Sequence, residues 1–486
     1  MEELIQDEIS KSLDDNVKYL KEILKDNSDV VFRQFYINDA KAALIYIDGM
    51  ADKVLLDDFV MRPLMMSLKP IKSLDDIKNR IMTVTDMKDV KKMSESLKWM
   101  LSGETIMLIE GIDVSIIIAN RSWVNRGVGE PSAETLVRGS REGLTETIRF
   151  NTALIRRRIR DTRLRMKPTT VGKRSKTDVV ITYIDDIVNK DILSQVEQKI
   201  DNINIDAILD SGYIEQLIED NSWSIFPQIQ STERPDVVAA ALFEGRVAVL
   251  VDNSPFAIIV PATLPSFFQS PDDYNQRWIY ASVIRIMRII AILIAMVLPA
   301  LYVAVTSFHT NIIPTKLAYS IAGSREGVPF PAFIEALIME VSLGLLLEAV
   351  VRLPKPIGAT IGIVGGIIIG QAAVSAGIVS PIMIIIVSLT AITSFITPNY
   401  SVTWALRLVR LLLIIAAAII GLYGIMLGLI VLIIHLARLK SFGIPYLAPA
   451  ANPNAVDYKD LYIRAPFQYF KTRPQFLNTG DKVRQK

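Results

Sequence analysis

The sequence contains no cysteine, and its only two histidines, His309 and His435, lie far apart in the chain. Disulfides, thiolate metal sites and cysteine nucleophiles are therefore excluded. The chain also lacks a G-x-G-x-x-G loop and a phosphate-binding P-loop. Because no nucleophile–base set, metal cluster or cofactor loop is visible, we expect a protein that is not an enzyme. We expect no catalytic residues, no cofactor and no metal site.

Charge is spread unevenly along the 486 residues, although the formal net charge is only +2. Most charged residues lie before residue 290, and most long apolar runs lie after it. This division predicts a front half that folds in water and a back half of membrane helices. The N-terminal stretch, MEELIQDEISKSLDDN, is acidic and lacks the apolar core of a signal peptide. We therefore expect the front half to stay in the cytoplasm.

A pattern of strands repeats within the front half. Residues 42–47 (AALIYI) resemble residues 179–184 (VVITYI). Residues 103–118 resemble residues 245–260, and the two pairs of segments are separated by nearly the same length of chain. Alternating β-branched residues around a glycine-containing turn predict a hairpin. The sequence thus predicts an α/β soluble region of two related subdomains, followed by an all-α polytopic membrane domain.

Between the two copies, residues 156–176 hold ten basic residues and one acid. Their charges either pair with acids elsewhere, contact another subunit or attract anionic lipid headgroups. Nucleic acid is not expected, because no aromatic residues for base stacking are interleaved. The expected organisation is a polar helical leader (1–28), a first cytoplasmic α/β subdomain (29–150), a basic connector (151–178), a second cytoplasmic α/β subdomain (179–270), a transmembrane helical domain (271–440) and a cytoplasmic basic tail (441–486).

The back half contains five apolar runs, at about 286–306, 332–351, 357–377, 381–397 and 408–434. A membrane helix needs about 20 apolar residues, so the short fourth run is either a thin span or a re-entrant segment. We expect four to six spans in total.

Basic residues indicate which ends of these runs face the cytoplasm. Arg285 and Arg288 are expected to mark the cytoplasmic side of the first run. The last run lies between the basic residues Arg407 and Arg410 at its start and Arg438 and Lys440 after its end, so the same rule places both of its ends inside, which is impossible for one simple span. We favour an internal C-terminus.

The run at 332–351 contains three acids. Glu348 can pair with Arg352 at i,i+4, and Glu335 is expected to reach the membrane interface. Glu340 lies near mid-membrane, where an ionisable group is costly and usually faces a bundle interior or a cavity. The sequence leaves two roles open for this intramembrane acid, a functional one and a structural hydrogen bond.

The run at 357–377 is unusually rich in glycine. One stripe of small residues would let a neighbouring helix approach closely, and it comprises Gly358, Gly362, Gly366 and Gly370. The opposite face is polar toward its ends and apolar between them, and it comprises Thr360, Val364, Ile367, Gln371 and Ser375. Two interpretations fit, a tightly packed bundle helix and a pore-lining face with a hydrophobic constriction.

Several long stretches also resemble one protein family. They include residues 137–160, 226–261, 270–288 and 324–381, the last of which contains SREGVPFPAFIEALIMEVSLGLLLEAVVRLPKPIGATIGIVGG. Together they are similar to the A subunit of the GerA-type spore germination receptors, over roughly residues 28–449. The first residues and the tail show no such signature.

The resemblance implies a multi-pass protein of the inner spore membrane that works with a nutrient-binding B subunit and a lipoprotein C subunit. It further implies a homo-oligomer, proposed to be a pentamer, that encloses a nutrient-gated path through which cations leave the spore. In that arrangement the glycine-rich helix lines the path, which favours the pore interpretation. Two other functions stay open, a secondary transporter and a non-conducting signalling scaffold of the receptor.

Overall fold

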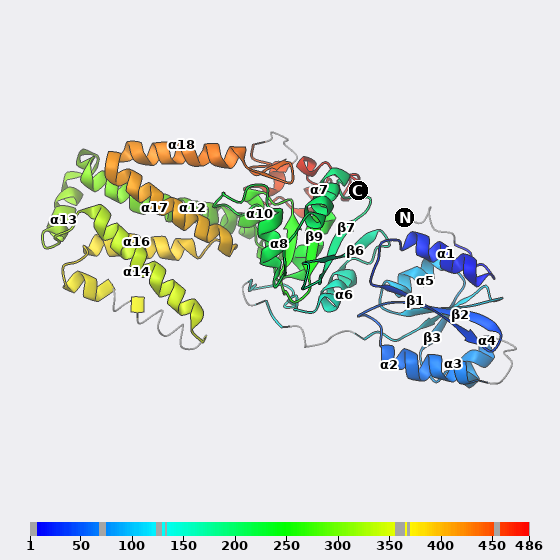
Figure 1. The fold of residues 1–486 in the computed structure, drawn as a ribbon. Coiled ribbons are helices and arrows are strands. Elements are labelled where there is room, and N and C mark those ends of the chain that lie inside the picture. The colour runs from blue at the N-terminus through cyan, green and yellow to red at the C-terminus, as the bar shows by residue number, and fades with distance from the viewer. Residues whose placement is uncertain are drawn as a thin grey trace.

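The computed structural model describes residues 7–67, 74–122, 129–131, 134–354, 365–366, 370–451 and 457–485. Two α/β lobes follow one another from the N-terminus, and a group of long helices lies beyond the second lobe (Figure 1). We call these parts the first lobe (residues 7–122), the second lobe (148–260) and the helical region (278–438). The predicted fold class, two related α/β subdomains followed by a helical part with apolar helices, is confirmed.

The first lobe is an antiparallel sheet with helices on both faces (Figure 1). Its elements are β1 (Val30–Ile37), β2 (Ala40–Ile47), β3 (Met87–Val90), β4 (Thr105–Ile109) and β5 (Ser115–Ile118), with α1 (Leu13–Ile23), α2 (Lys53–Leu55), α3 (Arg62–Met66), α4 (Leu74–Asp76) and α5 (Met93–Met100). Successive side chains of a strand point to opposite faces. Ile45 of β2 therefore clusters with Leu20 of α1, and the adjacent Leu44 clusters with Leu64 of α3.

The second lobe repeats this architecture. Its elements are β6 (Leu164–Val171), β7 (Thr177–Ile184), β8 (Gln230–Thr232), β9 (Val247–Val251) and β10 (Ala257–Val260), with α6 (Ile148–Arg158), α7 (Lys190–Asp201), α8 (Ser211–Ile218) and α9 (Pro235–Glu244). Ile181 of β7 clusters with Val196 of α7, and Val180 clusters with Leu242 of α9. The strand order is β6-β7-β9-β10-β8, which matches β1-β2-β4-β5-β3 in the first lobe.

Strand pairing also repeats residue by residue. Ala42 of β2 pairs with Ile109 of β4, and Val179 of β7 pairs with Val251 of β9. In the sequence repeat, Ala42 aligns with Val179 and Ile109 aligns with Val251. A shift of one residue would turn every side chain to the opposite face. The shared register therefore gives the two lobes equivalent cores, and the internal repeat is confirmed.

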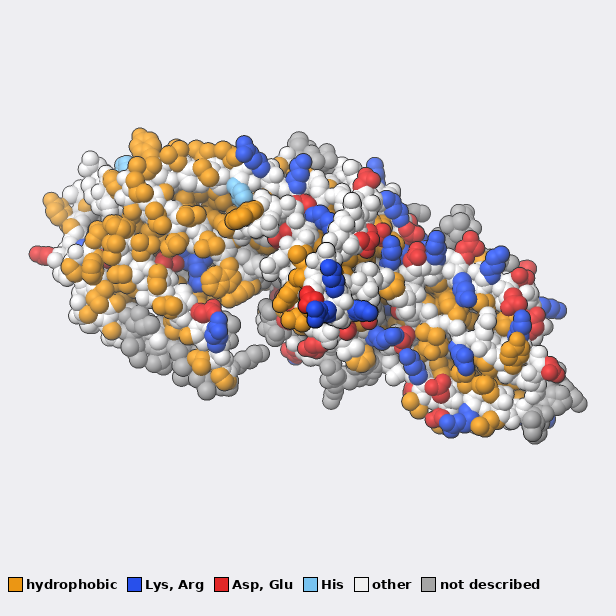
Figure 2. All heavy atoms as spheres, in the orientation of Figure 1, with side chains coloured by type: hydrophobic (Ala, Val, Ile, Leu, Met, Phe, Trp, Pro, Cys, Tyr) orange, Lys and Arg blue, Asp and Glu red, His pale blue; other side chains and the backbone are white. Residues whose placement is uncertain are grey.

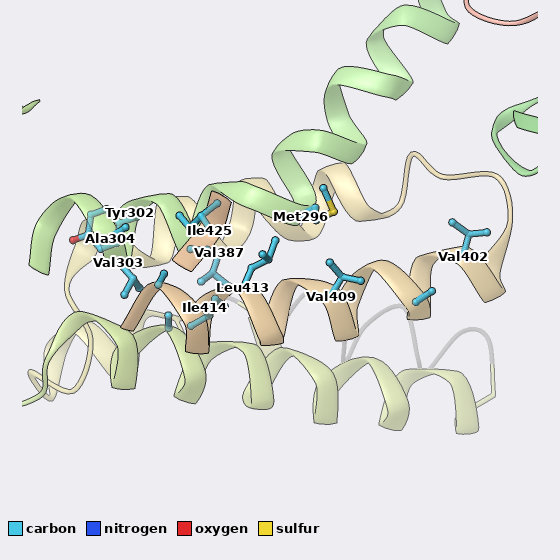
Figure 3. Close-up of a cluster of buried hydrophobic side chains, with 14 of the residues drawn as sticks. Met296, Tyr302, Val303, Ala304, Val387, Val402, Val409, Leu413, Ile414 and Ile425 are labelled. Atoms are coloured by element: carbon cyan, nitrogen blue, oxygen red, sulfur yellow. The ribbon is translucent and has the colours of Figure 1, made fainter. Parts of the chain in front are cut away.

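The helical region consists of α12 (Trp278–Ser307), α13 (Thr315–Arg325), α14 (Ala332–Arg352), α16 (Pro381–Ser394), α17 (Tyr400–Ile420) and α18 (Leu422–Arg438). Two of these helices, α12 and α17, are long and apolar enough to cross a membrane, and α16 and α18 are shorter apolar helices. Val303, Val387 and Ile414 belong to the buried core between the helices (Figure 3). Hydrophobic side chains also cover much of the visible outer surface of this region, whereas charged side chains gather on the lobes (Figure 2).

The last apolar run, predicted at 408–434, is not one helix. Gly421 has a φ of 62°, a backbone conformation that favours glycine, and it separates α17 from α18. The two helices then run antiparallel, with Gly428 packed on Leu413. Because the chain doubles back, the start of α17 and the end of α18 both lie toward the second lobe (Figure 1). This hairpin removes the conflict with the positive-inside rule.

The basic connector predicted at 151–178 contributes most of α6 and the strand β6 to the second lobe. Arg156 is completely buried, and its Nε and Nη2 atoms each donate to the Asp29 carboxylate at 2.9 Å. Arg158 donates to Glu142 at 2.6 Å. These basic side chains therefore pair with acids, and the Arg156–Asp29 pair joins the second lobe to the start of β1.

The tail after α18 returns to the second lobe (Figure 1). A short ladder joins β11 (Lys440–Ser441) to β12 (Ile444–Pro445). Farther on, the backbone N–H groups of Gly480 and Asp481 donate to carbonyl oxygens of Ile187 and Asp186, at 3.0 Å each. The precise domain boundaries, including those of the leader at 1–28 and the tail at 441–486, stay predictions.

We expect the buried Arg156–Asp29 pair to matter more for stability than an exposed pair of the same chemistry. Breaking a buried pair typically costs about 3–5 kcal/mol, because it leaves an unpaired buried charge. Arg156→Met should therefore lower the free energy of unfolding of residues 1–270 by an amount of that order, as measured by urea denaturation. Lys41→Met removes an exposed pair with Asp14 and should change little. Equal losses in both variants would contradict this account.

Candidate functional site: buried charges among the apolar helices

Four helices of the helical region meet around one buried ion pair. The Nη2 atom of Arg410, on α17, donates to Oε2 of Glu340, on α14, at 2.8 Å. The two side chains are only 2% and 5% exposed. The Nη1 atom of Arg410 donates to the Ala295 carbonyl oxygen of α12 and to Ser394 Oγ of α16, at 3.1 Å each. One arginine thus holds together α12, α14, α16 and α17.

The surroundings of this pair are apolar, which makes the pairing necessary. Val409 and Leu413, on either side of Arg410, belong to the buried core together with Met296 of α12 (Figure 3). Isolated charges in such a place are costly, and they persist only when they are paired and hydrogen-bonded. The Nε atom of Arg410 and the Oε1 atom of Glu340 have no hydrogen-bond partner among the described residues. The pair is therefore incompletely satisfied.

The sequence left the role of Glu340 open, and the structure gives it a partner that sequence reasoning did not identify. Arg410 was interpreted as a charge that flanks a span. The position of Arg410 could have indicated this pairing. The residue lies well inside the apolar helix α17, which begins at Tyr400. An arginine and a glutamate inside two apolar helices are expected to find each other.

Glu335, expected near the membrane interface, pairs with other groups of the protein, and its depth in a bilayer stays a prediction. Its side chain is fully buried. Its Oε1 atom accepts from Nε of Arg325 at 3.2 Å, and its Oε2 atom accepts from the backbone N–H of Ser380 at 2.8 Å. Ser380 is the N-cap residue of α16. The negative carboxylate of Glu335 therefore lies at the positive end of the α16 dipole, which is favourable.

A third group of charges lies where the second lobe meets α12. Arg285 and Arg288 of α12, predicted to mark the cytoplasmic side, are both buried. Arg288 pairs with Asp273 of α11 (Asp272–Asn275) at 3.0 Å, and Arg285 pairs with Asp460 of the tail at 2.8 Å. These pairs fasten α12 to α11, the short helix that follows the second lobe, and to the tail.

Tyr274 completes this junction. Its hydroxyl donates to Oδ2 of Asp460 at 2.6 Å. Burial, together with the nearby Asp460 carboxylate, raises the pKa of Tyr274 well above its usual value. The phenol therefore stays protonated at neutral pH and remains a donor.

The glycine-rich helix is described only in part. Five of its predicted site residues lie outside the described residues, namely Gly358, Thr360, Gly362, Val364 and Ile367. A Cβ on Gly370 would lie 3.8 Å from Ile384 of α16, whereas a Cβ on Gly366 would meet open space. Gln371 and Ser375, on the predicted pore-lining face, are exposed. The roles of both faces stay predictions.

A cavity of about 590 Å³ lies between the second lobe and the connection from α16 to α17. Its lining includes Glu134, Arg234, Arg288 and residues 395–399. The Glu134 carboxylate accepts from the Thr232 hydroxyl at 2.6 Å, and burial raises the pKa of Glu134 to about 7. Within the described residues, no group of three or more His, Cys, Asp or Glu side chains could hold a metal ion.

Comparisons with known proteins cover nearly the whole chain. Residues 18–476 match the family described as Bacillus/Clostridium GerA spore germination protein. The chain is 43% identical to spore germination protein B1 of Bacillus subtilis (strain 168), over 99% of this chain and 100% of that protein. It is 41% identical to spore germination protein GerLA of Bacillus cereus, over 98% of each chain.

One solved structure is also similar to this chain. It is the crystal structure of the N-terminal domain of the A subunit of the Bacillus megaterium spore germinant receptor GerK3. The match has 31% sequence identity and a TM-score of 0.41, and it covers 54% of this chain and 98% of that one.

We predict that removing one member of the Glu340–Arg410 pair harms the protein more than removing both. Glu340→Leu and Arg410→Leu each leave a buried charge unpaired, which typically costs about 3–5 kcal/mol. The abundance of each single variant in membranes should therefore fall, and the double variant should recover much of it. Glu340→Gln should keep its abundance, because the amide oxygen still accepts, but should alter the germination response. Quantitative immunoblotting and germination assays measure these two effects.

The matched control is Glu348→Leu, which breaks an exposed i,i+4 pair with Arg352 on the same helix. That variant should keep its abundance. Equal losses in the single and double variants would show that Glu340 and Arg410 are not coupled. Unchanged abundance and germination in Glu340→Leu would show that the residue merely fills space.

Proposed function

Because the chain belongs to the GerA family of Bacillus and Clostridium spore germination proteins, we propose that it is the A subunit of a nutrient-gated ion channel. In this proposal several copies assemble in the inner spore membrane, and nutrient binding opens a path for cations that triggers germination. The observation that carries the proposal is a polar helix face, at Gln371 and Ser375, that one copy of the chain leaves exposed.

The outer surfaces of the helices support a position within the bilayer. Val431 and Ile433 of α18 are 65% and 60% exposed, and Leu412 and Ile419 of α17 are 61% and 68% exposed. Exposed apolar surface of this extent is unfavourable in water and suits contact with lipid or with another subunit. This exposed apolar surface supports the proposal that the helical region is a multi-pass membrane domain.

The same helices leave little room for ions inside one copy. Val303, Ile414 and Ala417 are fully buried in the core, and the Glu340–Arg410 pair lies within the same bundle. A conducting path would therefore run between copies of the chain. This favours a homo-oligomer, and the family resemblance favours a pentamer.

The glycine-rich helix is the part of the chain that we assign to this path. Its face at Thr360, Val364, Ile367, Gln371 and Ser375 would line the axis. Val364 and Ile367 would form an apolar ring that blocks ions, because water leaves such a ring and an ion cannot shed its hydration there. The glycine stripe at Gly358, Gly362, Gly366 and Gly370 would pack against neighbouring helices.

Orientation follows from the basic ends of the α17–α18 hairpin. The start of α17, which carries Arg407, and the end of α18, which carries Arg438, lie toward the second lobe (Figure 1), and the positive-inside rule would assign that side to the cytoplasm. The lobes would then be cytoplasmic, together with the tail. The proposed partners are a B subunit that binds the nutrient and a lipoprotein C subunit, as the family resemblance implies.

A non-conducting signalling scaffold is the second candidate. The packed core of the described helices is the observation that favours it, because such a core also suits a purely structural role. The same core does not favour a secondary transporter, whose substrate site would lie near the middle of the membrane. Ion flux separates the channel from the scaffold.

We predict that Val364→Ser opens a leak in the absence of nutrient, because a hydroxyl wets the apolar ring. Ion leak from liposomes that contain the purified receptor measures this effect. Val431→Ser is the matched control, because it makes the same change on the outer surface of α18 and should not leak. Gly366→Leu should instead reduce assembly, because Gly366 faces open space within one copy and the proposal places a helix of a neighbouring copy there. A leak from Gly366→Leu with none from Val364→Ser would mean that the opposite face lines the path.

A further inference from the structure

A loop of the second lobe, residues 221–226 (NSWSIF), holds a tryptophan on the outside of the protein. Trp223 is 93% exposed, more than any other large hydrophobic side chain among the described residues. Neighbouring Ile225 is 42% exposed. An indole combines a large apolar body with one polar N–H group, so full exposure to water is unfavourable for most of its surface.

Hydrogen bonds within the loop hold its conformation, so the exposure of Trp223 is part of the fold. The buried Gln228 side chain closes the loop, because its Nε2 atom donates to the Asn221 carbonyl oxygen at 2.6 Å and its Oε1 atom accepts from the Asn221 N–H at 3.0 Å. The backbone N–H of Trp223 donates to Asn221 Oδ1 at 3.1 Å. The N–H of Phe226 donates to Ser224 Oγ at 3.1 Å. A preorganised loop binds a partner with little loss of conformational freedom.

The same loop is fastened to the end of α18 that faces the lobe. Ser224 Oγ lies 3.0 Å from Nε2 of His435, and the ring of Phe226 lies 6.3 Å from the His435 ring. His435 is in the last turn of α18, directly after Ile433 and Ile434, which are 60% and 48% exposed. The loop therefore lies at the edge of the exposed apolar surface of α18.

Two free cations lie at the same edge. Arg438 and Lys440 are exposed, and neither forms an ion pair with any residue in the described part of the chain. Asp220, the acid that directly precedes the loop in sequence, is already engaged by Lys199 and by the backbone N–H of Phe442. A tryptophan beside unpaired basic residues at the end of an apolar helix is the pattern found at membrane–water interfaces.

We propose that the loop at 221–226 contacts the lipid bilayer directly, with Trp223 at the level of the headgroups and Arg438 and Lys440 on anionic phosphates. The second lobe would then be held to the membrane surface at a second point, apart from its covalent link to α12. This inference rests on the position of α18 in a bilayer, and it does not depend on ion conduction. It can therefore fail or hold independently of the channel.

The absence of native cysteine allows a direct test on the full chain. Ile225→Cys keeps Trp223 and accepts a single nitroxide label. The labelled protein is reconstituted in vesicles of phosphatidylethanolamine and phosphatidylglycerol. Power-saturation spectroscopy then compares collisions with oxygen, which concentrates in lipid, and with a water-soluble nickel complex. Labels at Ile430→Cys, on α18, and at Tyr36→Cys, on the first lobe, serve as the lipid and water references.

We expect the label at position 225 to behave more like the Ile430 label than like the Tyr36 label. Adding Trp223→Ala should reduce its oxygen collisions, and the fold should tolerate this change because the side chain is almost fully exposed. A label at 225 that matches the Tyr36 reference would overturn the proposal. The proposal would also be overturned if the label were shielded from both oxygen and the nickel complex only when the other receptor subunits are present. The loop would then bind protein rather than lipid.

Discussion

A charge among apolar helices must find a partner, and this constraint arranges the helical region. Arg410 reaches the Glu340 carboxylate, the Ala295 carbonyl oxygen and Ser394, which fixes four helices around one guanidinium. Dispersion contacts alone would tolerate several rotations of such apolar helices, whereas an unpaired buried charge would not. The same constraint holds for Glu335, which lies nearer the loop between α13 and α14. Its carboxylate binds Arg325 and the backbone N–H of Ser380 at the start of α16.

The helix α12 connects these charges to the lobes. At its lobe end, Arg285 and Arg288 pair with Asp460 and Asp273. Ala295, whose carbonyl oxygen binds Arg410, lies two helical turns after Arg288, or about 10 Å along the axis at roughly 1.5 Å per residue. Because packed helices move as rigid bodies, a displacement of the second lobe would shift α12 and change the geometry at Arg410. The structure thus offers a short mechanical path from the junction at Asp273 and Asp460 to the bundle interior.

The lobes were predictable from sequence because strand periodicity and the internal repeat are local signals. The alignment of the repeated segments even predicts which strands pair in the second copy. The division of the last apolar run was harder to predict, because Gly421 lies within a stretch that is apolar on both sides. The partner of Glu340 was missed because Arg410 is 70 residues away in sequence, and only the packing of α14 on α17 brings the two together. The pore-lining face stays a prediction from periodicity and family resemblance.

Chemical modification of an introduced cysteine tests most directly whether the glycine-rich helix lines a conducting path. The chain has no cysteine, so Gln371→Cys offers a single reactive thiol on the exposed polar face. Nutrient-evoked current through the purified receptor in a planar bilayer is recorded before and after treatment with a charged thiosulfonate reagent. We predict that the current falls sharply when position 371 is modified, because a bulky charge then stands in the path. An unchanged current after complete labelling, or no current from a fully assembled receptor, would contradict the channel.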